Sequence, residues 1–358
     1  MSARSRDRRV YLASHPILFA LLAATRGRPV VRLGGTLLVH DRAAFTAALT
    51  RIPLNRTAEG TTGGAAGRLT GGDLLFDQHG EAHRQSRRAT AEALGTAGVA
   101  RLRPTWTGLL ERRLAPLAEG RTIDLVPIVA ELAGTTAAAL LDQPLDGQTL
   151  AAAAQAAGAT AARAHLPGLR RKHTSAAAQE AATRLTALVA PNGGPEAGLA
   201  TILAVAAITT TVAALPRATA WTADANLWRY AQSPALADEL LRVTAPTPLL
   251  PRVAAADGTL PAPSGGCPVH TGDRLLLIAR HAVDAHHLNP DPESPVPPQI
   301  ARLIFGIGPH ACPGARLARA QLTDLLVALS PYRPEVVRAR ADRRAALPGW
   351  RSLILRPR

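Results

Sequence analysis

The sequence holds little cysteine, few aromatic residues and almost no lysine, and each scarcity narrows the class of protein. Among 358 residues only Cys267 and Cys312 are cysteines, which excludes a disulfide framework and favours a reducing compartment. Phenylalanine, tryptophan and tyrosine number 4, 4 and 3, too few for a base-stacking surface, so we expect no nucleic-acid partner despite the net charge of +15. Lys172 is the only lysine, and the other 40 basic residues (41 minus 1) are arginines spread along the chain.

The first 40 residues contain only a short apolar run. Residues 4–9 are basic and residues 17–24 are apolar, an order that signal peptides also have. The run is too short to span a membrane, and Pro16 just before it suits the start of a helix. Residues 28–40 contain VVRLGG followed by TLLVH, the pattern of a β-hairpin. We therefore expect a short first helix packed on a hairpin, no membrane span and a cytoplasmic protein.

Apolar periodicity predicts a mainly helical chain that folds as a single domain over residues 1–358. Residues 199–215 are apolar nearly all round, which indicates a buried central helix that Pro216 stops or kinks. Beyond Pro246 the pattern changes to short strands and loops. The other helices are expected over residues 43–50, 82–94, 99–117, 125–141, 150–188 with a break at Pro167 and Gly168, 227–231 and 236–243.

The stretch from Phe305 to Arg319, FGIGPHACPGARLAR, carries the most chemistry. Cys312 ends a glycine-rich loop, and a helix is expected to begin just after it. A thiolate there meets the positive end of the helix dipole and unpaired backbone N–H groups, which lowers a thiol pKa and suits an anionic metal ligand. Gly306, Gly308 and Gly314 leave room for a large flat group. A haem ring with thiolate ligation fits these features.

Five positions of this stretch match the signature F-x-x-G-x-H-x-C-x-G, and through it the sequence resembles the cytochrome P450 family. The matching residues are Phe305, Gly308, His310, Cys312 and Gly314. The resemblance covers nearly the whole chain and implies haem b (iron protoporphyrin IX) as cofactor. It makes Cys312 the metal ligand, with Phe305, Gly306 and Gly314 in the cofactor-binding loop.

The same resemblance implies a mainly α, cytochrome P450-like helical fold with a small β portion. Only 58 positions (199 minus 141) separate Leu141 from Leu199, where the family holds a longer run of helices. We therefore expect a shortened, more open roof over the substrate pocket. Residues 204–211 and 245–250 should line this pocket, and because they carry no charge they suit a small organic substrate. Residues 56–72 are expected to form a surface loop or a substrate lid.

Buried haem propionates need cationic or hydrogen-bonding partners. His83 and Arg87 are four apart on one helical face and resemble the family's H-x-x-x-R clamp, with a solvated basic helix as the alternative. Arg252 follows the sequence PLLP and resembles a family arginine that reaches a propionate. His310 has the same role in the main signature.

Glu239 and Arg242 lie three apart on one helical face, 70 positions (312 minus 242) before Cys312. They resemble the family's structural E-x-x-R pair, and a surface ion pair is the alternative. The arginine that usually completes this network corresponds here to Ser294. We therefore expect the network to be rebuilt or incomplete, with Arg302 as a candidate substitute.

The central helix departs from the family pattern A-G-x-D/E-T-T and reads AAITTT over residues 206–211. Thr210 falls on the family's threonine, Thr209 replaces the acid and Ala207 replaces the glycine. These three are the expected catalytic positions on the oxygen side. Loss of the acid removes one member of a proton relay, which ordered water can replace. Threonines that only bond back to helix carbonyls are the alternative.

The resemblance implies a haem-thiolate monooxygenase, with ferredoxin and ferredoxin reductase as electron donors and a role in natural-product biosynthesis. The basic excess suits a docking face for such an acidic donor or a merely solvated surface. The altered helix favours, as an alternative, oxidative coupling or ring formation without net oxygen insertion.

Two further interpretations concern residues outside the matched motifs. Both cysteines precede proline, as in some haem sensors, so a non-catalytic haem-binding sensor is an alternative of another class, with Cys267 in a turn between strands. His281, His286 and His287 suggest a metal site, but a surface loop with histidines is the preferred interpretation.

Overall fold

The structure is a computed structural model that describes residues 2–55, 57–61, 63–64, 67, 88, 90–165, 171–194, 196–263, 265–308 and 311–358. Within these ranges the side chains of residues 162–165 and 171–175 are left out. The predicted helix over residues 82–94 falls mostly outside the described residues. His83, Arg87 and His310 also fall outside them.

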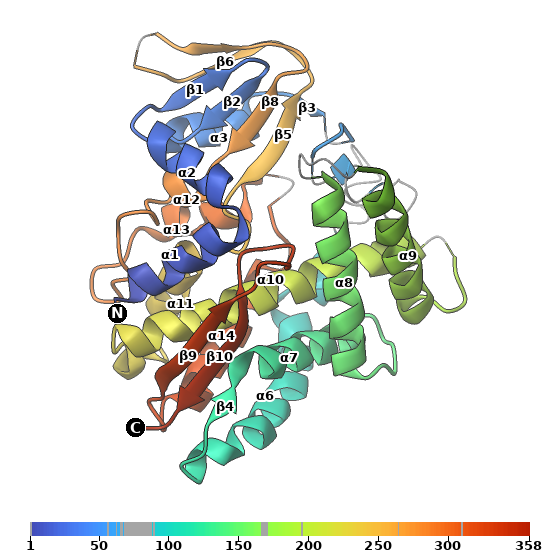
Figure 1. Ribbon diagram of the computed structural model, residues 1–358, viewed down its shortest axis with the longest axis vertical. Coiled ribbons are helices and arrows are strands. Elements are labelled where there is room, and N and C mark those ends of the chain that lie inside the picture. The colour runs from blue at the N-terminus through green and yellow to red at the C-terminus, as the bar shows by residue number, and fades with distance from the viewer. Residues whose placement is uncertain are drawn as a thin grey trace.

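The N-terminal segment places two helices and a hairpin at one end of the molecule (Figure 1). The elements are α1 (Ala3–Ser14), α2 (Pro16–Thr25), β1 (Val30–Leu33), β2 (Thr36–Val39) and α3 (Arg42–Thr50). The two strands pair antiparallel and turn at Gly34, whose φ of 58° favours glycine. The predicted hairpin and the helix after it are confirmed, whereas two helices precede the hairpin instead of one.

Within the described residues, the strands form three sheets. The largest has the order β1-β2-β8-β5-β3, with β3 (Leu54–Asn55), β5 (Leu250–Ala254) and β8 (Arg274–Leu277), and only β2 and β8 run parallel. The others are β4 (Ile123–Asp124)-β10 (Trp350–Arg356)-β9 (Glu335–Ala341) and β6 (Gly258–Leu260)-β7 (Cys267–Val269). Cys267 is therefore the first residue of a strand, paired with Leu260, and its predicted place in a turn is wrong.

Helices form the rest of the molecule (Figure 1). The longer ones are α6 (Thr96–Ala118), α7 (Leu125–Leu140), α8 (Gly147–His165), α9 (Arg171–Val189), α10 (Ala197–Asp224), α11 (Pro234–Val243) and α14 (Ala315–Leu329). Shorter ones are α12 (Ala279–Ala282), α13 (Pro298–Ala301) and the 3-10 turns η1 (Trp228–Tyr230) and η2 (Arg302–Phe305). The predicted helices from residue 99 to residue 243 are confirmed, except that residues 227–231 form only η1. Within the described residues, α8 and α9 fill the stretch between α7 and α10, and the more open roof expected over the pocket stays a prediction.

Helix α10 crosses the helical part of the molecule as the predicted central helix (Figure 1). Every residue from 211 to 223 is buried. Of the two effects expected of Pro216, a stop or a kink, the stop is wrong, because α10 continues to Asp224, and the kink stays a prediction. A proline inside a helix costs about 3 kcal/mol, so packing beyond it must offset the loss. The next residue, Arg217, is fully buried and donates from Nε to Oδ1 of Asp7 at 2.7 Å and from Nη1 to the carbonyl of Thr244 at 3.2 Å.

By length and composition, α10 could also cross a membrane, with a mean hydropathy of 2.0 over its most apolar 18-residue window. Half of this window, 50%, is buried inside the fold. Its place beside α7, α8 and α14 therefore accounts for the apolar composition.

Glu239 and Arg242 on α11 form a buried ion pair whose side chains are only 1% and 0% exposed. Nε of the guanidinium bonds to Oε1 at 3.0 Å, and Nη2 bonds to Oε2 at 2.6 Å. The carboxylate also accepts two backbone N–H groups at 3.2 and 3.1 Å, and the guanidinium donates to two backbone carbonyls at 3.2 and 3.1 Å. These four backbone groups belong to Asp291, Val296, Val283 and Asn289. The network is thus rebuilt from main-chain groups.

The expected third partners take other positions. Ser294 is exposed and makes no hydrogen bond to Glu239 within the described chain. Arg302 donates to Oδ2 of Asp238 at 3.0 Å, and Arg319 reaches Oδ1 of the same carboxylate at 2.6 Å. The prediction that Arg302 substitutes in the Glu239 network is therefore wrong, because backbone amides already saturate that carboxylate.

We predict that Glu239→Ala lowers the free energy of unfolding by about 3–5 kcal/mol, because it leaves a buried guanidinium without its counter-charge. The matched control is Glu180→Ala on α9, which removes an exposed helical ion pair with Arg184 and should cost about 0.5 kcal/mol or less. Urea unfolding of both variants measures the difference. Equal losses would contradict the structural role given to the buried pair.

Candidate functional site

The loop that carries Cys312 is closed by its own backbone. After η2, the chain turns through Gly306 and Gly308, which both have a φ of 73°, a conformation that favours glycine. The amide of Cys312 then donates to the carbonyl of Phe305 at 2.7 Å. Helix α14 begins three residues later, with Gly314 as its N-cap residue. The thiol is exposed and stands just before a helix N-terminus, as the sequence predicts.

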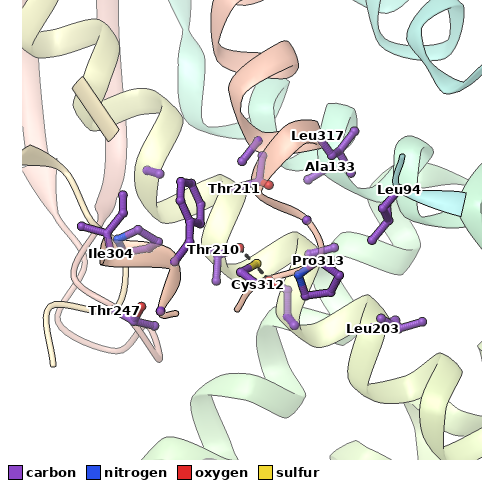
Figure 2. Close-up of a pocket in the computed structure, with 18 of the residues that line it drawn as sticks. Leu94, Ala133, Leu203, Thr210, Thr211, Thr247, Ile304, Cys312, Pro313 and Leu317 are labelled. Carbon is purple, nitrogen blue, oxygen red and sulfur yellow. Dashed lines mark hydrogen bonds between the residues drawn. The ribbon is translucent and has the colours of Figure 1, made fainter. Parts of the chain in front are cut away.

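This thiol opens on a cavity of about 290 Å³. In Figure 2, Cys312 lies between Thr247 on one side and Leu94 on the other. The walls come from α7, α10, α14, the loop before β5 and the loop that precedes α14. Apolar lining residues include Ala133, Ala137, Leu140, Leu203, Ala214, Leu215, Leu241, Leu250, Ile304 and Leu317. Both pocket segments expected from the sequence, residues 204–211 and 245–250, contribute to the lining, as do Thr61 and Gly63 of the expected lid.

Arg252 is the only charged side chain among the described lining residues, and no carboxylate lines the described part of the wall. It lies on β5, and its Nη1 donates to the carbonyl of Pro251 at 2.8 Å. The cavity therefore offers one thiol and one guanidinium within otherwise apolar or neutral walls. Such a site suits a ligand that is mainly hydrocarbon and carries a negative group.

The three residues of α10 that were expected to be catalytic do not all face the cavity. Ala207 and Thr210 line the cavity, whereas Thr209 does not. The methyl group of Thr209 lies 3.0 Å from where a Cβ on Gly158 would stand, so this side chain faces α8. Both threonine hydroxyls donate to helix carbonyls, Thr209 to Val205 at 2.6 Å and Thr210 to Ala206 at 2.7 Å. Bonding back to the helix, the alternative raised from the sequence, is present at both positions.

Two polar residues of the described lining, Thr136 and Gln321, lie outside the pocket segments expected from the sequence. Gln321 on α14 and Thr136 on α7 are buried, and the amide Nε2 of Gln321 donates to Oγ1 of Thr136 at 3.0 Å. Thr211 on α10 also lines the cavity, and its hydroxyl makes no hydrogen bond with any described residue. A lone glutamine on the apolar face of a predicted helix is the one signal that could have marked Gln321.

No protein-family model matches the chain, and no curated protein matches it in sequence. Solved structures match it over nearly its whole length. P450BioI, in complex with acyl carrier protein ligated with hexadec-9Z-enoic acid, has a TM-score of 0.76 at 17% identity, over 97% of this chain and 100% of that one. CYP109E1 from Bacillus megaterium, in complex with testosterone, has a TM-score of 0.73 at 18% identity, over 97% and 99%. CYP108D1 from Novosphingobium aromaticivorans has a TM-score of 0.71 at 22% identity, over 96% and 94%.

All of these structures are cytochromes P450, and at such identities the likeness concerns the fold. The chain therefore has the cytochrome P450 fold. The mainly α fold class with a small β portion, predicted from the sequence, is confirmed.

A second cavity, of about 380 Å³, gathers histidines between α2, β2, α3 and α12. His281, on α12, lies with its Nδ1 2.7 Å from Nδ1 of His40, and His286 and His287 continue the row with a ring-nitrogen distance of 3.0 Å. His40 Nε2 lies 3.1 Å from Oγ1 of Thr25, whose hydroxyl already donates to a helix carbonyl at 2.8 Å. The ring of His40 must therefore donate from Nε2, and His281 must donate from Nδ1.

A surface loop was expected for His281, His286 and His287. His287 is exposed and lies in a turn after α12, as expected, whereas His281 belongs to α12 and lies beside buried His40. Within the described ranges, no group of three or more metal-ligating side chains is placed to hold an ion. The metal interpretation raised from the sequence therefore gains no support. Burial lowers the pKa of His40 and His286 from 6.5 to about 4 and that of His281 to about 3. These imidazoles are therefore neutral at pH 7.

We predict that the free energy of unfolding decreases as the pH falls from about 6.5 to about 4 and is insensitive to these groups above that window. The unfolded chain binds protons near pH 6.5, whereas the folded chain resists protonation until about pH 4. His281→Gln should flatten this slope, while His270→Gln, at a side chain that is 63% exposed, should keep it. Urea unfolding at several pH values measures both variants, and an unchanged slope in His281→Gln would contradict the prediction.

Proposed function

We propose that the chain is a haem-thiolate oxidoreductase, a cytochrome P450 monooxygenase that acts on a small organic substrate. The observation that carries this proposal is the thiol of Cys312, which opens on an apolar cavity from a loop that its own backbone closes. The P450 fold supports the same assignment. In this proposal haem b occupies the cavity and Cys312 is the iron ligand.

The residues present fit such a cofactor. A Cβ on Gly314 would stand 3.8 Å from Sγ of Cys312, so its absence leaves the space beside the sulfur open to a flat ring. Phe305 and Gly306 line the same wall, and Arg252 supplies a cation for a propionate. His83, Arg87 and His310 complete the proposed set of propionate partners.

When bound, haem supplies oxygen activation, and a thiolate ligand favours cleavage of the O–O bond. The chain contributes the surroundings of that chemistry. The N-terminus of α14 favours the ionised form of the Cys312 sulfur. Leucine, isoleucine and alanine side chains exclude water from the cavity. Ala207 leaves space on the face of α10, and the hydroxyl oxygen of Thr210 can accept a hydrogen bond from a water molecule while it donates to Ala206.

The apolar walls support an apolar substrate. Two of the matched structures are complexes with a fatty-acyl carrier protein and with a steroid, which agrees with this class of ligand. We place the enzyme in natural-product biosynthesis, in the cytoplasm, with ferredoxin and ferredoxin reductase as electron donors. Exposed Arg316 beside the Cys312 loop, together with Arg302 at 48% exposure, supports docking of an acidic donor on that side.

We predict that Cys312→Ser abolishes the thiolate Soret signature of the reduced carbon monoxide complex, because serine cannot supply the thiolate. Cys267→Ser, a matched change at the other cysteine, should retain it. Absorption spectra of the haem-loaded variants measure the signature, and its loss only in Cys267→Ser would overturn the ligand assignment.

Substrate turnover with a surrogate ferredoxin pair separates an enzyme from a haem-binding sensor, for which turnover would be absent.

A second candidate function, oxidative coupling or ring formation, is favoured by one specific observation. No carboxylate lines the described part of the cavity, and the side chain at the position of the family's acid, Thr209, faces α8. Such a coupling reaction would convert O₂, the two substrate hydrogens, two electrons and two protons into the coupled product and two water molecules. It needs as many external protons as oxygen insertion, so this candidate is supported by the altered motif of α10 and not by a lower demand for protons.

We predict that turnover in isotopically labelled dioxygen distinguishes the two candidates. A monooxygenase transfers one labelled oxygen atom to the product, whereas a coupling enzyme transfers none. Mass spectrometry of the purified product measures the label. The first proposal fails if turnover is efficient and the product carries no label, and the second fails if each product molecule carries one labelled atom.

A further inference from the structure

Helix α2 is apolar on all sides and yet lies on the surface. Its sequence is PILFALLAAT, and of its ten residues only Leu22 is buried. Ile17 is 85% exposed and Leu21, one turn further, is 39% exposed, and Leu12 at the end of α1 is 40% exposed. Helices that are apolar all round are normally buried in a core or in a membrane. Exposed apolar patches of this kind mark binding surfaces.

The inner face of α2 already has its partners. Leu22 packs in a small cluster with Val31, Leu38 and Ile278, and the ring of Phe19 meets the edge of Tyr11 at 4.9 Å between centroids. Helix α1 in turn is tied to the end of α10, because Nε of Arg6 bonds to Asp224 at 2.6 Å. The fold therefore presents the outer face of α2 on a fixed support.

Arginines lie on both sides of α2 along the chain. Between residues 2 and 40 the sequence contains seven arginines and a single acidic residue, Asp7, which is buried and paired inside the core. Four of these arginines are exposed and have neither an ion pair nor a side-chain hydrogen bond with any described residue. They are Arg8, Arg9, Arg26 and Arg28. An apolar helix face with arginines on both sides along the chain suits a partner that has an apolar layer beneath anionic groups.

The length of α2 decides how it can meet such a surface. Ten residues at about 1.5 Å each give roughly 15 Å, about half of the 30 Å that a membrane span requires. The helix can therefore lie in the plane of an interface but cannot cross it. A bilayer with anionic headgroups offers both elements at the right depth, with phosphates for the arginines above an acyl region for Ile17 and Leu21.

We propose that α2 and the adjoining end of α1 form a peripheral docking surface for an anionic lipid bilayer. The outer side chains of α2 enter the boundary of the acyl region, and the flanking arginines contact lipid phosphates. The surface lies on the edge of the sheet portion and is independent of the Cys312 cavity (Figure 1).

Co-flotation of the purified protein with vesicles tests this proposal. The wild type should bind vesicles of phosphatidylcholine mixed with phosphatidylglycerol, bind weakly to pure phosphatidylcholine, and lose affinity as salt rises. The double variant Ile17→Glu/Leu21→Glu should reduce the partition coefficient by about tenfold or more, and Arg26→Glu/Arg28→Glu should do the same. Thermal unfolding checks that each variant remains folded.

The matched control is Val337→Glu, which adds a charge at a 51% exposed apolar residue on β9, outside α1 and α2. It should bind vesicles as the wild type does. Absence of wild-type binding, or an equal loss in Val337→Glu, overturns the proposal. A wild-type dimer that Ile17→Glu/Leu21→Glu dissociates, as measured by light scattering, also overturns it, because a second copy would then cover this face.

Discussion

The buried ion pair of Glu239 and Arg242 is the interaction on which the arrangement of the site depends. Two charges without access to water are tolerated only when their hydrogen-bonding positions are filled, and removal of one partner leaves a severe penalty. Here the fillers are main-chain groups between residues 283 and 296. These hydrogen bonds therefore hold the irregular segment between α12 and α13 against α11. The Cys312 loop begins a few residues further on.

Helix α14 is fixed on the far side of that loop by polar contacts of its own. Asp324 accepts Trp106 Nε1 at 2.9 Å and both Nε and Nη2 of Arg103, which ties α14 to α6. Gln321 ties it to Thr136 on α7. The loop is thus held at one end by the buried ion pair and at the other by a helix whose rotation is set by hydrogen bonds. Because these contacts hold the loop and α14, the walls of the cavity can be lined mainly by apolar side chains.

The parts of this structure that were predictable from sequence follow from short-range patterns. Hairpin, helix periodicity and the cysteine loop each depend on residues within about 20 positions, and a fixed motif spacing identified the fold. The errors concern contacts between distant segments. Pro216 reads as a helix end, but Arg217 gains buried partners from α1 and from Thr244, which sequence proximity does not reveal. Arg302 was a candidate for Glu239 because nothing in the sequence shows that two backbone amides, together with Arg242, occupy that carboxylate.

The histidine row and the cavity wall show the same limit. His40 and His281 are 241 positions apart, and only the pairing of β2 with β8 brings them together. On α10 the spacing correctly puts Ala207 and Thr210 on one face, because residues three apart share a helix side. Thr209 was placed with them by analogy to a motif, and helical geometry turns it toward α8. A rotation of about 100° per residue turns these two threonines toward different surfaces even though they are adjacent in sequence.

That rotation bears on how protons reach the cavity. The hydroxyl of Thr210 donates to Ala206, so it can offer a lone pair to water but must break a helix-side bond to donate. The hydroxyl of Thr211 has no such bond within the described chain and can turn either way. With no carboxylate in the described lining, a proton that enters from this side has to come from water ordered by these hydroxyls. Side chains of this kind position a proton and do not supply one, so any proton that reaches the cavity along this wall has to be carried by water.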